Sequence, residues 1–186
     1  PELFINNSLE FYEDESDYLE YTFIDDSNDN LTFSLSGGSN IEAILDIENQ
    51  EISFVPNLDF NGQESFTFTI SDEEFTDVEI LNVSVLAVND APVMSDIDDQ
   101  EMNEGETLEI GLSGQDVDGD DLIYTIEGGG ENIQVFIEAA AATFTTNDND
   151  WNGSEVFEVT VSDGILSDSK IFTLTVIPVN DAPQIT

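Results

Sequence analysis

The stretch FTFTISD, residues 66–72, alternates apolar and polar side chains up to a closing Ser-Asp, and FEVTVSD repeats the pattern at residues 157–163, 91 positions later. Alternation with a period of two is typical of a β-strand that buries one face. A linker segment returns as well, because VNDAP occurs at residues 88–92 and again at residues 179–183. The sequence therefore predicts two tandem modules, residues 1–91 and 92–186, with the second running into the start of the next linker.

Similar alternating runs fill most of both modules, and turn clusters such as residues 25–30, 37–40 and 128–130 separate them. No helical period competes over a useful length. The spacing predicts an all-β chain of two seven-stranded β-sandwiches. The short linker contains a Pro and no Gly/Ser-rich spacer, so we expect the sandwiches to be arranged end to end with limited hinge freedom.

The last strand of each module shows a shift in apolar parity. It falls between Ile80 and Leu81 in the first module and between Ile171 and Phe172 in the second. We expect a β-bulge or a strand crossover at both places.

The charge balance excludes several classes of function. Asp and Glu number 43 against a single cation, Lys170, so the formal net charge is −42, with no His and no Cys. Such a chain repels nucleic acid, and the absence of His and Cys removes the base and thiol of nucleophilic triads. Disulfides are impossible, and no apolar stretch is long enough for insertion into a membrane. Hydrophobic residues make up 39% of the chain, which favours a folded protein over a disordered one.

Clustered carboxylates need a cation, because two of them about 5 Å apart repel by roughly 0.8 kcal/mol even in water. Calcium prefers carboxylate, amide and carbonyl oxygens, which this chain supplies in abundance. We place the site where turns of both modules converge on the linker. The candidate ligands are Glu13, Asp59 and Asn61 from the first module, Asn89 and Asp90 from the linker, and Asp116, Asp118 and Asp163 from the second. The alternative is a solvated, saline-adapted acidic surface.

A second set of residues repeats part of this pattern at the far end of the second module. Glu104, Asp150, Asn180 and Asp181 are predicted to form half of a further site.

Several motifs in one order carry a family resemblance. They are Asn103-Glu104-Gly105-Glu106, Asp116-Val117-Asp118, Asp59-Phe60-Asn61-Gly62, Ser162-Asp163-Gly164 and the Val88–Pro92 linker. Together they resemble bacterial cadherin-like tandem repeats, which occur in large secreted adhesins and in some surface polysaccharide-degradation systems. The resemblance implies Greek-key, cadherin-like or Ig-like sandwiches. It makes Glu13 the base glutamate, Asp116 and Asp118 the paired aspartates, Asp163 the late aspartate, and Asn89 with Asp90 the linker ligands.

The match to animal cadherins is incomplete. The linker lacks one carboxylate and one amide of their pattern. Their Asp-Arg-Glu turn corresponds to Asp59-Phe60-Asn61 in this chain, which leaves open whether Asp59 or Asn61 replaces the Glu. Ser27 also stands where the second module has Asp118. We therefore expect fewer than three ions at the junction and a weaker site at the leading end of the first module.

Two motifs have competing interpretations. Residues 116–127 have the outline of an EF-hand loop, but Asp121 occupies the position of the turn Gly and a strand pattern follows. Trp151 suggests sugar stacking, whereas its counterpart Phe60 favours an apolar plug beneath a turn.

The sequence predicts a non-enzymatic, calcium-binding module pair of a secreted or cell-surface bacterial protein. Calcium would stiffen a rod for cell adhesion or for extending an adhesin. Neighbouring repeats are the expected partners, with homophilic cell-surface contacts or polysaccharide as further ones. The alternatives are a calcium-dependent polysaccharide-binding pair and a passive spacer.

Overall fold

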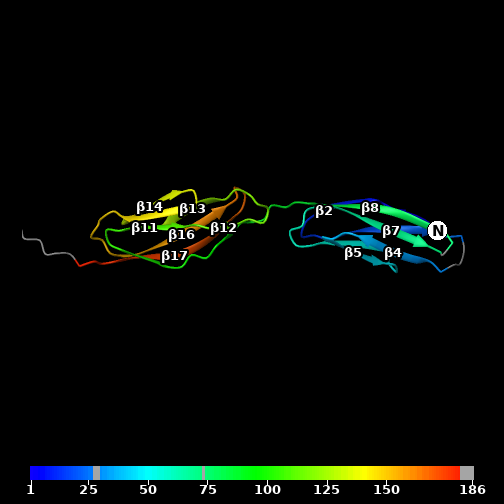
Figure 1. The fold of residues 1–186 in the computed structure, drawn as a ribbon, viewed down its shortest axis with the longest axis horizontal. Coiled ribbons are helices and arrows are strands. Elements are labelled where there is room, and N and C mark those ends of the chain that lie inside the picture. Colours follow the sequence, from blue (N-terminus) through cyan, green and yellow to red (C-terminus); the bar gives the residue numbers. More distant parts are fainter. Residues whose placement is uncertain (27–29, 73, 181–186) are drawn as a thin grey trace, which may run out of the picture. The chain divides into compact units, whose positions relative to one another are not determined.

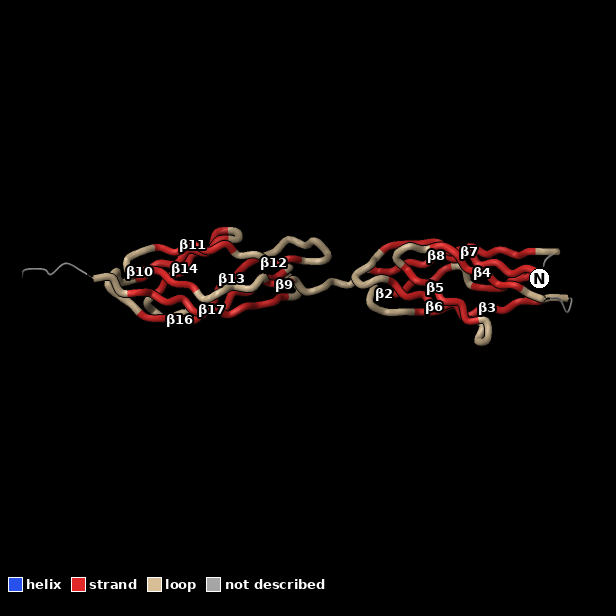
Figure 2. The backbone as a smooth tube through the Cα atoms, turned by 60° about the horizontal axis from the view of Figure 1, so that its bottom comes forward, coloured by secondary structure: helices blue, strands red, loops and turns tan. Residues whose placement is uncertain are grey.

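A computed structural model describes residues 1–26, 30–72 and 74–180. Over these residues it consists of strands, turns and loops, and no helix is long and apolar enough to cross a membrane. The chain divides into two compact units, Pro1–Val88 (unit 1) and Asn89–Thr186 (unit 2). Figure 1 labels many of their strands, and Figure 2 shows that in each unit the strands run lengthwise while most loops lie at the two ends. The predicted all-β architecture is confirmed.

Unit 1 is built from two four-stranded sheets. The order of the first is β1-β3-β6-β5 and that of the second is β2-β8-β7-β4. The strands are β1 Glu2–Ile5, β2 Ser8–Tyr12, β3 Asp17–Ile24, β4 Thr32–Gly37, β5 Ile41–Asp46, β6 Glu51–Pro56, β7 Gly62–Ser71 and β8 Thr76–Leu86. Neighbouring strands are antiparallel except β2 and β8, which run parallel.

Unit 2 repeats this plan with more interruptions. Its sheets have the orders β10-β17-β16-β13, β11-β15-β14 and β12-β9. The strands are β9 Val93–Met94, β10 Gln100–Asn103, β11 Thr107–Gly111, β12 Gly114–Gln115, β13 Ile123–Gly128, β14 Ile133–Glu138, β15 Ala141–Thr146, β16 Gly153–Ser162 and β17 Ser167–Ile177. β10 and β17 form the parallel pair that corresponds to β2 and β8.

The leading strand of each unit changes sheets partway along. β1 pairs with β3, whereas β2, two residues later, pairs with β8 in the other sheet. β9 and β10 divide in the same way, and β11 with β12 forms a second interrupted strand. If each interrupted strand is counted once, both units contain the seven strands predicted from the sequence.

The alternating apolar residues form a separate core in each unit. In unit 1, Tyr21, Phe54, Phe66 and Phe68 are almost completely buried, and the Tyr21 and Phe68 rings meet edge to face at 4.8 Å between centroids. In unit 2, Phe144, Phe157 and Phe172 pack with centroids 5.2–5.8 Å apart. Each buried ring contributes about 1.5–3 kcal/mol through the hydrophobic effect.

The predicted bulge in the last strand of each unit is wrong. β7 and β8 pair without interruption from Gly62–Val85 to Ser71–Thr76, and β16 and β17 do the same. Parity does not change, because Ile80 and Ile171 point outward and are 57% and 66% exposed, while the buried positions continue through Leu81 and Phe172.

Candidate metal site

Glu13 follows β2 and is 2% exposed, although it carries a charge. Its N–H donates to the carbonyl oxygen of Leu86 at 2.9 Å. Its Oε1 accepts a hydrogen bond from the Val88 N–H at 2.5 Å, and its Oε2 accepts one from Asn61 Nδ2 at 3.3 Å. These donors are neutral, and the only Lys of the chain belongs to unit 2, where its Nζ lies 3.1 Å from Asp96. Glu13 thus holds the start of the linker against unit 1 without a basic partner.

Asp59 lies in the turn between β6 and β7, in the left-handed backbone region with a φ of 56°. Asp14, directly after Glu13, has a φ of 64°. Carboxylate oxygens of Asp14 and Asp59 lie within 4.8 Å of each other, so this end of unit 1 gathers a second group of acids. Sequence reasoning missed Asp14. The only signal was its position beside the base glutamate, which carries little weight in so acidic a chain.

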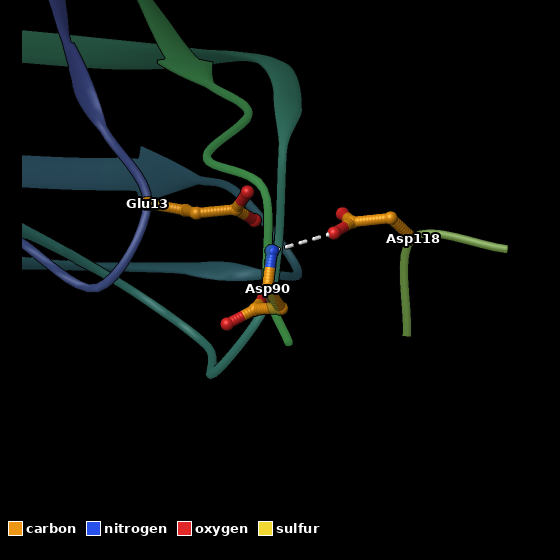
Figure 3. Close-up of side chains that lie close together, drawn as sticks. All are labelled: Glu13, Asp90 and Asp118. Atoms are coloured by element: carbon orange, nitrogen blue, oxygen red, sulfur yellow. Dashed lines mark hydrogen bonds between the residues drawn. The ribbon is translucent and has the colours of Figure 1, made fainter. Parts of the chain in front are cut away.

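The linker residues are bound to unit 2 by their own hydrogen bonds. Asn89 Nδ2 donates to Asp163 Oδ2 at 2.8 Å and to the Asp90 carbonyl oxygen at 3.0 Å. The Asp90 N–H donates to Asp118 Oδ2 at 2.8 Å, the bond drawn in Figure 3. These hydrogen bonds bring Asn89, Asp90, Asp118 and Asp163 together within unit 2.

Asp116 organises the loop that carries Asp118. Its Oδ1 accepts the N–H groups of Asp118, Gly119 and Asp120 at 3.0, 3.0 and 3.3 Å, as Asp side chains commonly do in turns. Its Oδ2 is buried and has no hydrogen-bond partner. A buried carboxylate oxygen without a donor is costly, so this atom calls for a ligand.

Three carboxylates meet at this loop. Oxygens of Asp116, Asp118 and Asp120 all lie within 4.8 Å of one another. At that separation each pair of charges repels by roughly 0.9 kcal/mol at the dielectric constant of water and by several times more near a protein surface. Asp120 was not among the predicted junction ligands, although the alternate spacing of the three Asp residues indicated it.

Asp163 lies in the turn between β16 and β17, where it accepts a hydrogen bond from the Asn89 side chain. Its Oδ1 accepts the N–H groups of Ile165 and Leu166 at 2.6 and 2.7 Å. The Asn89 side chain, followed by the Ile165 N–H, lowers the pKa of Asp163 below its ordinary value. Asp163 therefore remains a carboxylate at neutral pH.

The second predicted set repeats the contacts of Glu13. The Glu104 N–H donates to the Ile177 carbonyl oxygen at 2.9 Å, Glu104 Oε1 accepts the Val179 N–H at 2.7 Å, and Oε2 accepts Asn152 Nδ2 at 3.2 Å. Asp150 is exposed, and its N–H donates to Asp148 Oδ1 at 3.1 Å. Asn180 is exposed, and Asp181, like Ser27, lies outside the described residues.

Trp151 lies beneath a turn. It is half-buried, packs on the core of unit 2 and abuts Gly153, where an added Cβ would lie 2.8 Å from the Trp151 ring. Gly153 has a φ of 155°, which also favours glycine. Phe60 and Gly62 form the corresponding pair in unit 1. This packing matches an apolar plug rather than a sugar platform.

The EF-hand interpretation of residues 116–127 does not fit. Glu127, which would be the twelfth ligand, is an exposed residue of strand β13. The acidic loop leads into this strand, and within the described residues no helix flanks it.

Comparison with protein families identifies the two modules as members of one type. The family model described as "Bacterial Ig domain" matches the chain twice, over residues 4–84 and 89–176. No curated protein matches the chain at a significant level.

Solved structures with two or more cadherin domains share the fold. Human protocadherin-24 EC1-2 aligns with a TM-score of 0.60 at 17% identity, over 95% of this chain and 95% of that one. Drosophila N-cadherin EC1-4 aligns with a TM-score of 0.57 at 12% identity, over 95% of this chain and 50% of that one. At these identities the comparison shows the fold alone. It confirms the predicted cadherin-like and Ig-like sandwiches.

An enzyme also appears among the structural matches. The chain aligns with an endo-fucoidan hydrolase from glycoside hydrolase family 107 over 93% of its own length and 28% of the enzyme, at 19% identity. The TM-score of 0.38 is too low to support an argument about this chain.

Proposed function

This chain belongs to the bacterial Ig domain family, and from that premise we propose that it is a non-enzymatic, extracellular spacer pair whose units are held in line by calcium. Family membership supports a location at or beyond the cell surface. The fold shared with cadherin domains supports a role in adhesion, as a spacer that extends an adhesive partner.

The observation that carries the proposal is the unpartnered, buried Oδ2 of Asp116 beside the carboxylates of Asp118 and Asp120. A hard cation with a preference for oxygen would satisfy this atom and remove the mutual repulsion of the three charges. The chain has no His or Cys that would favour a softer metal.

Chain connectivity extends the proposed site to the other unit. Val88, Asn89 and Asp90 are consecutive, and consecutive Cα atoms are about 3.8 Å apart. Glu13 of unit 1 binds the first of these residues, whereas Asp163 and Asp118 of unit 2 bind the second and third. We therefore assign Glu13, Asp59, Asn61, Asn89, Asp90, Asp116, Asp118 and Asp163 to the proposed calcium-binding junction, which would hold fewer than three ions, with Asp14 and Asp120 as additional candidate ligands.

Calcium at this position would supply positive charge to converging carboxylates. Their repulsion would then turn into attraction through a shared ion, and the linker would lose its freedom to bend. In an array of such pairs, Glu104, Asp150, Asn180 and Asp181 would begin the same arrangement with a following module.

Calorimetric titration with Ca²⁺ tests the site directly. We expect binding to the intact pair with a Kd of about 10⁻⁴–10⁻³ M, the range of extracellular modules. Asp116→Asn should weaken binding by about tenfold or more, because it removes a charged ligand. Glu109→Gln, the same type of charge removal at an exposed position of β11, is the matched control and should bind like the parent chain.

Small-angle scattering tests the consequence for stiffness. With calcium, the chain should have one large maximum dimension. With chelator, the distribution of interatomic distances should broaden toward shorter values. Identical scattering under both conditions, or equal calcium affinity of the Asp116→Asn and Glu109→Gln variants, would refute the proposal.

A further inference from the structure

The two outer faces of unit 1 differ sharply in charge. We call the outward side of the sheet β2-β8-β7-β4 the neutral face. Its outward residues are Ser8, Glu10 and Tyr12 on β2, Thr76, Val78, Ile80, Asn82, Ser84 and Leu86 on β8, Gln63, Ser65, Thr67, Thr69 and Ser71 on β7, and Thr32, Ser34 and Ser36 on β4. Among these described positions, Glu10 is the only charged residue.

The opposite side of the same unit carries the charge. The outward residues of the sheet β1-β3-β6-β5 include the carboxylates Glu2, Glu20, Glu42, Asp46 and Glu51. In a chain with a net charge of −42, the neutral face is therefore a local exception that the overall composition does not explain.

The neutral face exposes two neighbouring apolar side chains on β8, and hydroxylated residues of β7 and β4 lie beside them. Val78 and Ile80 on β8 are 48% and 57% exposed. Ile80 lies opposite Thr67, which lies opposite Ser36, so a row of uncharged side chains crosses three strands. Depletion of charged residues is the feature that this face shares with the centres of protein–protein interfaces.

Screening determines where two such anions can touch. At physiological salt the Debye length is about 8 Å, so repulsion between two copies depends mainly on the charges close to their contact. Acidic faces repel at that distance, whereas the neutral face places only Glu10 near the contact. In so acidic a protein, the surface that can approach the neutral face with the least repulsion is therefore another uncharged face.

We propose that the neutral face of unit 1 docks against the neutral face of a second copy of this chain. The contact is isologous, with a two-fold axis near Ile80, so that each copy presents the same strands to the other. This association is independent of the calcium site, because none of the proposed metal ligands lies among the outward residues of this face.

The size of the face predicts a weak contact. Four strands about 4.8 Å apart, the longest of 11 residues at about 3.3 Å each, offer at most about 700 Å² per copy. Two copies then bury at most about 1,400 Å², near the lower limit for stable interfaces. A single contact is therefore transient, and contacts repeated along an array would add through multivalency.

Unit 2 offers a natural comparison. Ile171 is its counterpart of Ile80, but Ile171 lies opposite Glu158 rather than a Thr. Glu101 and Glu127 also point outward from that sheet. The same face of unit 2 is thus charged, and we do not assign it to the contact.

Sedimentation equilibrium of the whole chain in EDTA and about 0.15 M NaCl tests the proposal. The apparent mass should rise from 20.5 kDa toward twice that value as the concentration approaches about 1 mM. Ile80→Glu should weaken association at least tenfold, because it places a carboxylate from each copy at the contact. Ile171→Glu adds the same charge at the matched exposed position and should change association less than twofold.

Thr67→Glu is a second variant of the neutral face and should act like Ile80→Glu, which guards against a folding defect in either one. A chain that stays monomeric at about 1 mM would overturn the proposal, as would equal weakening by Ile80→Glu and Ile171→Glu or association that requires calcium. The face would instead be assigned to polysaccharide if two results were found together. The chain would sediment as a monomer, and a neutral glucan in native gels would retard the parent chain but not the Ile80→Glu variant.

Discussion

Glu64 and Glu155 occupy corresponding positions in the two units but have different surroundings. Glu64 accepts the backbone N–H groups of Ser39, Asn40 and Ile41 at 2.9, 3.0 and 3.1 Å. Glu155, which is 8% exposed, accepts Asn132 Nδ2 at 3.1 Å, and its Oε2 is buried without a partner. The unit 2 loop has three consecutive glycines, residues 128–130, and packs against Glu155 without supplying the same donors.

This difference has a consequence for acid stability. Desolvation raises the pKa of Glu64, but hydrogen bonds from Ser39 and Asn40 outweigh it and bring the pKa from 4.5 to about 2. Because the folded pKa is depressed, the stabilisation is complete above pH 4.5 and disappears as the pH falls through about 2. After allowance for solvent screening of a partly exposed group, it amounts to about 1–2 kcal/mol for unit 1.

Glu64→Gln should therefore lower the free energy of unfolding of unit 1 by about 1–2 kcal/mol at neutral pH. The free energy of unfolding of unit 1 should also vary less between pH 5 and pH 2 in this variant than in the parent chain. Urea titrations can follow unit 1 through the β7 amides by NMR and unit 2 through the fluorescence of Trp151, the only Trp. Glu155→Gln should lower the free energy of unfolding of unit 2 by less, because the Glu155 carboxylate accepts fewer hydrogen bonds than that of Glu64. Equal costs for the two variants would contradict the assignment.

At the scale of elements, each of the first three residues of the linker is hydrogen-bonded to the unit to which it belongs. Its first residue is held by Glu13 of unit 1, and its next two residues are held by Asp163 and Asp118 of unit 2. The Asn89 side chain is the largest cause of the lowered pKa of Asp163. Linker docking and the titration of Asp163 are therefore linked.

Asn89→Ala should raise the pKa of Asp163 toward its ordinary value of 3.8 while leaving it lowered, because the Ile165 and Leu166 N–H groups still donate. An NMR titration of the Asp163 carboxyl carbon measures this change. Asp72, which accepts the corresponding backbone donors in unit 1, is the internal control and should not respond. An unchanged Asp163 titration would show that the linker amide does not act on it.

Much of the element structure could be predicted from alternation, and the error has a clear cause. Runs such as residues 66–70 have apolar residues on one parity only, and they are strands with one buried face. In β8 and β17, apolar residues occur at both odd and even positions. The step from Ile80 to Leu81, and from Ile171 to Phe172, therefore suggested a bulge, whereas Ile80 and Ile171 are apolar residues on the outward face. Which face a branched side chain takes depends on the opposing sheet, and a single strand does not contain that information.

The candidate site was predictable to a similar degree. The repeat identified Glu13, Asp116 and Asp163 as paired positions; in the structure Asp116 and Asp163 organise their own turns, whereas Glu13 accepts the distant Val88 N–H. Asp14 was missed, because one acid among 43 gives no signal of its own. The role of the Val88 N–H was also invisible, since backbone donors leave no mark in the residue types.

At the scale of the whole molecule, a net charge of −42 opposes the compact state. Raising NaCl from 0.01 to 0.15 M shortens the Debye length from about 30 to about 8 Å and screens most of this repulsion. Calorimetry in EDTA should show unfolding temperatures that rise by about 5 °C or more over this range. Sucrose at equal osmolality does not screen charge and should produce a smaller rise, so a temperature that falls with salt, or that responds equally to sucrose, would contradict this prediction.

The parallel pairing of the first and last strands has a mechanical consequence. β2 runs alongside β8 from Ser8–Asn82 to Tyr12–Leu86, and β10 runs alongside β17 in the same sense. Tension applied through the two ends of a unit pulls these partners past each other lengthwise. Their backbone bonds are then loaded in shear and must break together, whereas the strands of a hairpin can unzip one bond at a time. The pairing of β2 with β8 and of β10 with β17 thus favours resistance of each unit to stretching along its strands.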